Sequence, residues 1–165
     1  MSFYRIVRHL VSDHRLVRRR FPKRSLGAIE EAIRKSEGTH RGEIRFAVEA
    51  SLDWGPLFRG QTARQRAIEV FSRLRIWDTE ENSGVLIYLL LADRDVEIVA
   101  DRGINARVGA AEWERICREM ELAFREGRFE EGVLAGIRAV SAHLARYYPG
   151  QDKRRNELPD SPVVL

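Results

Sequence analysis

The stretch NSGVLIYLLLADRDVEIVADRGI, residues 82–104, decides the fold. Its first part, residues 85–92, is a run of apolar and partly β-branched side chains that is too short to cross a membrane. This run predicts a strand buried on both faces in the middle of a sheet. After a two-residue polar break, residues 95–101 alternate between apolar and acidic side chains. The alternation predicts a second strand, which pairs with the first in a hairpin.

The segments around this hairpin predict helices and one earlier strand. The sequence EIRFAVEA, residues 43–50, alternates like a strand with one buried face. Apolar spacings of three and four residues predict helices over residues 25–36 and 62–74, and two more that end near Gly127 and at Pro149. Strands joined by a crossover helix are usually parallel, so the first two strands run the same way and the third is antiparallel. The expected fold class is α/β, a three-layer α/β/α sandwich with a small mixed central sheet that includes an antiparallel hairpin.

Composition and charge divide the chain into three parts. With 165 residues, 44% of them hydrophobic, it has enough apolar side chains for one good core. Residues 1–24 form a basic arm with eight basic residues and one acidic residue, a net charge of +7. The remaining 21 basic and 24 acidic residues make the rest mildly acidic. We expect an α/β domain over residues 25–148 and a disordered tail over residues 149–165, which are polar and contain prolines.

The basic arm has helical periodicity over residues 3–21, with apolar residues on one side and arginines mostly elsewhere. One interpretation is an amphipathic helix that engages an anionic membrane surface or a partner. The other is a helix docked on its own domain with a solvated basic face. A nucleic-acid partner is disfavoured, because the arm has no recognition motif and the domain has no further basic surface.

The sequence also predicts where the protein works. The N-terminal residues lack the apolar core of a signal peptide, and no stretch is long enough to span a membrane, so we expect a cytoplasmic protein. A peripheral position at the inner membrane would follow if the arm engages lipid. Cys117 lies on the apolar side of a predicted helix and is interpreted as a small buried hydrophobic residue. His40 and His143 have no ligand or catalytic partner at a recognisable spacing.

Acidic residues gather at both ends of the predicted sheet. Because the hairpin reverses direction, the loop before its first strand lies beside the exit of its second. That end collects the oxygen donors Asp78, Glu80, Glu81, Asn82, Asp101 and Asn105. The predicted ligands of a Ca²⁺ or Mg²⁺ ion are Asp78, Glu81, Asn82 and Asp101. The opposite end collects Asp53, Asp93 and Asp95, a second and less favoured cluster. Turns at strand ends are also often acidic simply because they are exposed to solvent, so both clusters can equally be interpreted as ordinary turn residues.

Four segments in register resemble the TPM domain family. They are RGEIRFAVEAS, the helix that ends VFSRLRIW, the hairpin of residues 82–104, and the helix junction AFREGRFEEGVLAGI. Family members typically show a Gly-Glu pair entering the first strand, here Gly42-Glu43. They also share an apolar hairpin with a polar turn and an "FR.G" junction between the last two helices. The resemblance covers about residues 26–145.

The resemblance implies a three-layer sandwich and brings two functional precedents. Some relatives are described as divalent-metal binders with acid-phosphatase activity, and others as accessory factors for membrane protein complexes. Many relatives are exported and tethered, unlike this chain as we interpret it. Many also carry an Asp at the helix start after the glycine-rich turn, where this chain has Gly109-Ala110-Ala111.

The sequence therefore favours a non-catalytic accessory or interaction module with a protein partner, such as a membrane protein complex. The alternative is a divalent-metal-dependent phosphatase of the TPM type. In that case Asp101 is the carboxylate placed to hold a metal-bound water or to act as nucleophile.

Overall fold

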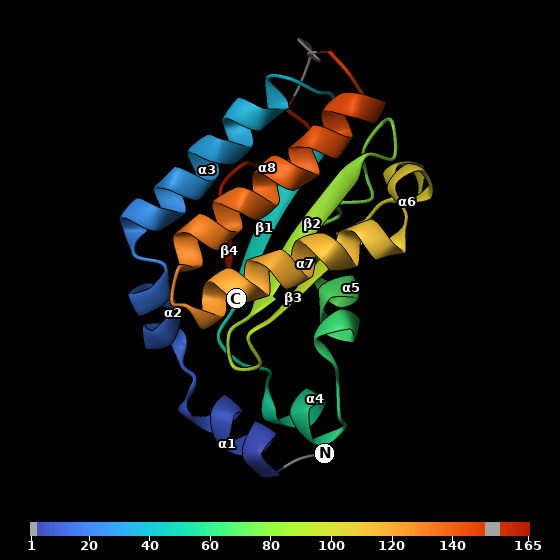
Figure 1. Cartoon of the computed structure of the whole chain (residues 1–165). Coiled ribbons are helices and arrows are strands. Elements are labelled where there is room, and N and C mark those ends of the chain that lie inside the picture. The colour runs from blue at the N-terminus through green and yellow to red at the C-terminus, as the bar shows by residue number, and fades with distance from the viewer. Residues whose placement is uncertain (1–2, 151–155) are drawn as a thin grey trace.

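A computed structural model describes residues 3–150 and 156–165 of the chain, and it contains a four-stranded sheet flanked by helices (Figure 1). The elements are α1 (Phe3–Val11), α2 (His14–Arg20), α3 (Lys23–Glu37), β1 (Glu43–Glu49), α4 (Trp54–Phe58), α5 (Ala63–Arg73), β2 (Gly84–Leu90), β3 (Asp95–Ala100), α6 (Arg102–Val108), α7 (Ala110–Arg125), α8 (Phe129–Tyr147) and β4 (Val163–Val164). The strand order is β3-β2-β1-β4. β1 and β2 are parallel, and β2 and β3 are antiparallel. The predicted hairpin and the interior position of its first strand are therefore confirmed.

The sheet separates two hydrophobic cores. On one face, side chains such as Phe46, Ile87 and Ile98 pack against α3, α7 and α8. On the other face, Ala47, Leu86 and Tyr88 pack against α5 and the short helix α4. Every residue of β2 is buried, which is why its sequence is continuously apolar. The three-layer α/β/α sandwich is confirmed.

The N-terminal arm differs from the single helix predicted over residues 3–21. It consists of α1 and α2, because the Asp13 carboxylate caps α2 by accepting hydrogen bonds from the backbone N–H groups of Arg15 and Leu16. Val17 and Phe21 are buried in the first core, and the Phe21 ring packs 5.8 Å from that of Phe46. The second half of the arm is thus part of the domain, since its apolar side chains complete the core.

The expected disorder of residues 149–165 is wrong for residues 156–165; residues 151–155 lie outside the described part. β4 pairs in parallel with β1, and the Leu165 N–H donates to the Val48 carbonyl at 2.9 Å. Leu158 is buried in the second core. The physical reason is that β1 would otherwise leave a sheet edge open, and the apolar end PVVL can cover it. The polar composition of residues 149–165 gave no sign of this pairing.

Two short helices, α4 and α6, occupy segments for which the sequence patterns predicted no helix. α4 contains Gly55 and Pro56, which suggested a turn, but Pro56 stands in the first turn of the helix, where proline is tolerated. α6 begins directly after β3, and Asp101 caps it by accepting a hydrogen bond from the Arg102 N–H at 2.7 Å. In the described residues, no helix has the length and apolar character needed to cross a membrane.

Candidate functional site

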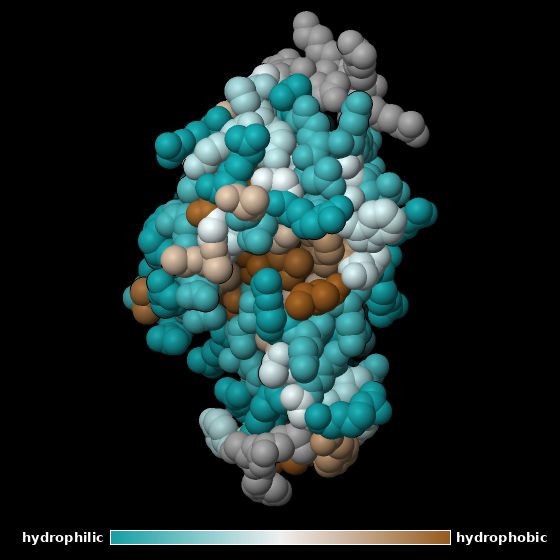
Figure 2. All heavy atoms as spheres, turned by 90° about the vertical axis from the view of Figure 1, so that its right-hand side faces the viewer, coloured by the Kyte–Doolittle hydropathy of each residue, from teal (hydrophilic) through white to brown (hydrophobic). Residues whose placement is uncertain are grey.

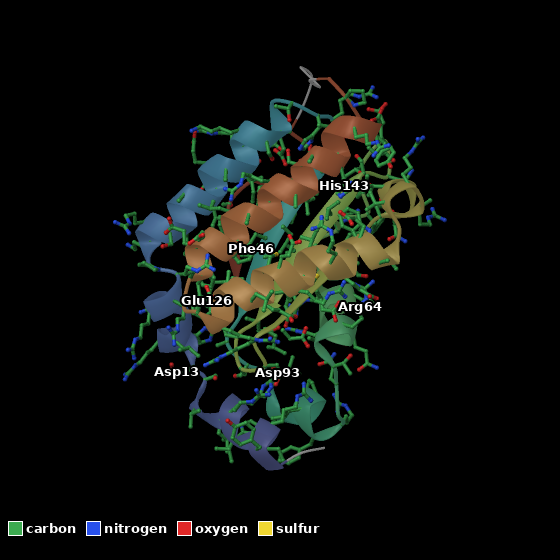
Figure 3. The ribbon with its side chains drawn as sticks, in the orientation of Figure 1. Asp13, Phe46, Arg64, Asp93, Glu126 and His143 are labelled. Carbon is green, nitrogen blue, oxygen red and sulfur yellow. The ribbon has the colours of Figure 1, made fainter. Side chains whose placement is uncertain are left out.

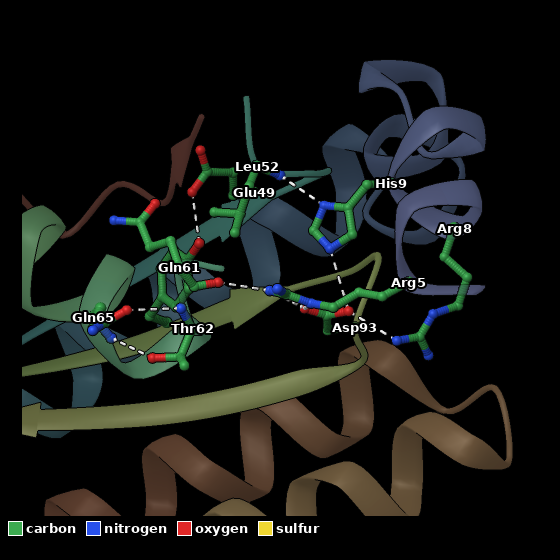
Figure 4. Close-up of polar contacts among 10 residues, drawn as sticks. Arg5, Arg8, His9, Glu49, Leu52, Gln61, Thr62, Gln65 and Asp93 are labelled. Carbon is green, nitrogen blue, oxygen red and sulfur yellow. Dashed lines mark hydrogen bonds and ion pairs between the residues drawn. The ribbon is translucent and has the colours of Figure 1, made fainter. Parts of the chain in front are cut away.

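Asp93, at the turn between β2 and β3, anchors α1 to the domain (Figure 4). Its carboxylate accepts a hydrogen bond from Arg5 Nε at 2.9 Å and one from Arg8 Nη2 at 2.8 Å. His9 Nε2 lies 3.2 Å from the same carboxylate, and His9 Nδ1 accepts a hydrogen bond from the Leu52 N–H at 3.0 Å. One acidic side chain thus contacts three polar side chains of α1.

The charges at this anchor follow from burial and pairing. Burial alone would raise the pKa of Asp93, but the hydrogen bond from Arg5 and the charges of His9 and Arg5 outweigh it. The pKa of Asp93 therefore lies below its ordinary value. The pKa of His9 is also lowered, chiefly because burial disfavours the charged imidazolium, although Asp93 opposes this effect. The anchor is an ionised carboxylate between two arginines.

Because its polar side faces the domain, α1 turns its apolar side chains outward. His9 is only 4% exposed, whereas Tyr4, Leu10 and Val11 are 70%, 53% and 75% exposed. A surface helix usually does the reverse, burying its apolar stripe and exposing its polar face. The arrangement leaves apolar side chains on the outer surface of a helix that is held in place by ion pairs.

The short helix α4 extends this apolar surface. Trp54 and Phe58 are both more than half exposed, and their rings stack with centroids 5.7 Å apart. Leu10 and Trp54 line the same pocket of about 210 Å³, so the two helices are neighbours, as Figure 1 also shows. Figure 3 places Asp93 just inside this end of the molecule. We call the exposed set Tyr4, Val7, Leu10, Val11, Trp54 and Phe58 the α1–α4 surface.

Arginines lie beside the α1–α4 surface at Val11. Val11 lines a pocket together with Arg8, Arg20 and Arg94, and Arg94 is exposed. The exposed face of α2 adds further cations, namely Arg15, Arg18 and Arg19. The apolar patch therefore has basic neighbours on its Val11 side.

The predicted metal ligands share one end of the sheet but do not form a ligand set. The Ile104 N–H donates to the Asn82 carbonyl at 3.2 Å, which brings the loop of residues 78–83 against the start of α6, as the topology predicted. Asp78 is ion-paired with Arg75, and Glu81 with Arg41. Among residues 3–150 and 156–165, no group of three or more His, Cys, Asp or Glu side chains could hold a metal ion.

Two of the predicted ligands each leave one carboxylate oxygen without a partner in the described structure. Asp101 uses Oδ1 to cap α6, and its buried Oδ2 makes no hydrogen bond. Glu81 Oε2 is likewise buried and unpaired. Ca²⁺ and Mg²⁺ need six or more oxygen ligands, and two orphan oxygens are an incomplete set. Asn105, which was grouped with them, instead accepts a hydrogen bond from Trp113 Nε1 at 3.1 Å.

A further pair of carboxyls lies near the start of β1. Glu37 Oε1 accepts a hydrogen bond from the Ile44 N–H, and Glu43 Oε1 accepts one from the Glu157 N–H. Burial, and secondly the charge of Glu43, raises the pKa of Glu37 to about 9. Burial also raises the pKa of Glu43 to about 7. Arg45 acts on both electrostatically, but no ion pair within 4 Å joins it to either among the described residues.

The remaining candidates have structural roles. Cys117 is buried, as predicted, and burial raises the pKa of its thiol to about 12, far from that of a nucleophile. His40 is buried, and burial lowers its pKa to about 4. His143 lies 3.0 Å from Glu112 on the surface of α7. Among the described residues Cys117 and His40 have no activating partner, and His143 pairs with a partly exposed carboxylate.

Sequence reasoning missed the anchor that orients α1. Asp93 was grouped with Asp53 and Asp95 as a possible cation site, and the arginines of the arm were assigned to a solvated face. The contact between Arg8 and Asp93 joins residues 85 positions apart, and no local spacing indicates such a pair. A usable signal was present at α4, where Trp54 and Phe58 stand in a segment that otherwise looks like a loop.

Comparisons with known proteins agree with this fold. The TPM domain family matches residues 21–143. The solution structure of the BA42 protein from the psychrophilic bacterium Bizionia argentinensis is 31% identical, covers 86% of this chain and 93% of its own, and has a TM-score of 0.74. The N-terminal domain of a P. gingivalis protein is 17% identical, covers 78% of this chain and 79% of its own, and has a TM-score of 0.61, a likeness of fold alone. No match was found among the curated proteins.

Proposed function

From the premise that the chain belongs to the TPM domain family, we propose that it is a non-catalytic accessory module that binds an anionic membrane surface through the α1–α4 surface. It would act in the cytoplasm at the inner membrane, where a protein partner such as a membrane protein complex is within reach. The observation that carries the proposal is the orientation of α1, with His9 buried and Leu10 exposed. A helix that served only to cover its own domain would bury Leu10.

The chemistry of the α1–α4 surface fits a bilayer interface. Aliphatic side chains and the amphipathic rings of Tyr4 and Trp54 can enter the boundary between headgroups and acyl chains. The bordering arginines can at the same time bind anionic headgroups, each contributing about 1 kcal/mol near the surface. The Asp93 anchor supports the proposal because it orders α1 before it meets the membrane, which lowers the entropy lost on binding.

Co-sedimentation of the full chain with lipid vesicles tests the proposal. We expect binding to phosphatidylglycerol vesicles, weaker binding to phosphatidylcholine vesicles, and release as salt screens the arginines. Leu10→Asp should weaken binding roughly tenfold or more, since it replaces an apolar contact by a charge. Because Leu10 is exposed, the substitution should leave the thermal unfolding midpoint nearly unchanged.

Leu122→Asp is the matched control, because Leu122 is 55% exposed, against 53% for Leu10, and lies on α7, outside the α1–α4 surface. It should bind vesicles like the unaltered protein. Equal loss in the two variants, or no binding of the intact chain to anionic vesicles at low salt, would contradict the proposal. Loss of a protein partner by Leu10→Asp without any vesicle binding would assign the surface to that partner instead.

A second candidate function, the metal-dependent phosphatase, rests on the orphan oxygens of Glu81 and Asp101. Of the four expected ligands, these two supply unpaired anionic oxygens, while Asp78 is engaged by Arg75. Titration of Ca²⁺ or Mg²⁺ followed by heat would reveal such a site, and Asp101→Asn should abolish the signal. Hydrolysis of an aryl phosphate that survives both a chelator and Asp101→Asn would exclude this mechanism.

A further inference from the structure

β3 is an outer strand of the sheet, and within the part of the chain that the structure describes only β2 pairs with it. The Asp101 N–H donates to the Gly84 carbonyl of β2, so the odd-numbered residues direct their backbone groups toward β2. The backbone groups of Val96, Ile98 and Ala100 consequently point away from the sheet. An edge of this kind is a template on which another extended chain can pair.

Side chains occupy the outward backbone groups that another strand would use. The Val96 N–H donates to Glu121 Oε1 at 3.3 Å, and Arg64 Nη1 donates to the Ile98 carbonyl. The Ile98 backbone also hydrogen-bonds the Cys117 thiol, which is a weak acceptor. Glu121 and Arg64 have long, flexible side chains, and a peptide backbone can replace the one hydrogen bond that each makes to the β3 backbone, while Arg64 can keep its contact with Glu97. These contacts satisfy backbone hydrogen-bonding groups at the β3 edge, but they do not prevent another strand from pairing there.

A groove of about 520 Å³ runs along this edge between α5 and α7. Figure 2 shows it as a hollow at the middle of the face, with hydrophobic side chains at its floor and polar ones around it. Its charged lining comprises the four carboxylates Asp95, Glu97, Glu114 and Glu121 and the two arginines Arg64 and Arg118. Burial, together with Glu97 and Glu121, raises the pKa of Asp95 to about 6. Arg64 pairs with Glu97 and Arg118 pairs with Glu114, whereas Asp95 and Glu121 have no ion pair among the described residues. Asp95 and Glu121 repel each other, so a cationic ligand would relieve this repulsion.

We propose that the β3 edge binds an extended segment of a partner protein that carries lysine or arginine side chains and adds to the sheet as a further strand. Its backbone pairs with the outward groups of Val96, Ile98 and Ala100, and its basic side chains meet the acidic lining of the groove. This site lies on β3 and α7, apart from the α1–α4 surface, so it does not depend on the membrane proposal.

Titration of the full chain with three peptides, followed by backbone amide NMR, tests the inference. The peptides are an alternating valine–lysine sequence, its valine–glutamate counterpart, and the lysine peptide with its backbone N-methylated along one edge. We expect the lysine peptide to shift the amides of Val96, Ile98 and Ala100. The other two peptides should bind at least roughly tenfold more weakly, because the glutamate peptide lacks the positive charge and the N-methylated peptide lacks the backbone N–H donors.

Two variants of the protein sharpen the result. Val96→Pro removes an outward N–H while leaving the pairing with β2 intact, because proline is tolerated at a solvent-facing edge position. Val96→Ala loses side-chain volume but keeps the N–H, so it should bind the lysine peptide while Val96→Pro does not. If Val96→Pro fails to fold, the N-methylated peptide answers the same question. Unshifted β3 amides, or equal affinity for the N-methylated peptide, would overturn the proposal.

Discussion

The two ends of the central sheet neutralise their buried carboxyls in different ways. At the end where β2 turns into β3, Asp93 stays ionised because Arg5 and Arg8 pair with it. At the opposite end, Glu37 and Glu43 have no ion pair with Arg45, and burial raises the pKa of both. The carboxylate at one end is thus neutralised by arginines from a segment distant in sequence, and the carboxyls at the other end are neutralised by binding protons. The comparison teaches that an acidic residue at a strand end has no fixed role until its long-range partners are known.

The two ends make opposite contributions to stability as pH changes. The pKa of Asp93 is lowered on folding, so its contribution is present above the ordinary value of 3.8 and is lost as pH falls. The pKa of Glu37 is raised from 4.5 to about 9, so its contribution is complete below 4.5 and is lost as pH rises toward 9. The protein should therefore be most stable in mildly acidic solution.

The largest expected effect comes from Asp93→Ala. It leaves two guanidinium groups without their shared counter-ion and removes the carboxylate beside His9, and breaking a partly buried ion pair in this way is destabilising. Because Arg8 is partly exposed, we expect a loss of about 3 kcal/mol, measured by urea unfolding. Release of α1 should also make the arginines of the arm more sensitive to trypsin.

Asp78→Ala is the control for this prediction. Asp78 also pairs with an arginine, but both side chains of that pair are more than half exposed. Exposed ion pairs contribute little, so the change should stay within about 0.5 kcal/mol. A similar small effect of Asp93→Ala would mean that the anchor does not hold α1.

A smaller effect is expected at the opposite end, from the pH dependence of Glu37→Gln. The unaltered protein should lose on the order of 2 kcal/mol between about pH 5 and pH 9, after allowance for partial solvent screening. Gln keeps an acceptor for the Ile44 N–H but cannot ionise, so the variant should lose much less over the same range. Urea unfolding at a series of pH values measures both slopes.

Glu31→Gln tests whether that slope belongs to Glu37. Glu31 lies on the same helix, is partly exposed and pairs with Arg34, which lowers its pKa. It is therefore ionised over most of this pH range in both the folded and the unfolded state. If Glu31→Gln flattens the slope as much as Glu37→Gln does, the assignment is wrong.

Local patterns were sufficient to predict the sheet and its layers. The continuous apolar run of β2 and the alternation in β3 report directly which faces are buried, and helix periodicity does the same for α5, α7 and α8. β1 alternates as well, but both of its faces are buried, so the prediction of one buried face was wrong for this strand. The same patterns failed for β4, where two residues pair with β1 from the far end of the chain. A two-residue strand has no periodicity, and its existence depends on an edge that only the folded sheet creates.

The site was less predictable because it depends on how α1 is oriented. The alternation of apolar and basic residues indicated an amphipathic helix, but that pattern does not say which side faces the domain. Asp93 decides the orientation through Arg5, Arg8 and His9. The topology did place Asn82 and Asp101 at one end of the sheet, yet it could not show that Arg75 and Arg41 engage the neighbouring carboxylates.

The smallest expected effect comes from Asp101→Asn, the conservative substitution at the open end of the same hairpin. Asn retains a side-chain oxygen that can cap α6, and the oxygen it replaces with an amide group makes no hydrogen bond among the described residues. We therefore expect a change within about 0.5 kcal/mol in urea unfolding, whereas Asp93→Asn should destabilise the chain because two arginines lose a charged acceptor. The experiment is sharpest in the presence and absence of Ca²⁺. If the cation stabilises the unaltered protein and Asp101→Asn removes that stabilisation, the orphan carboxylates of this end bind a cation; identical unfolding curves under all four conditions would leave Asp101 as a helix cap alone.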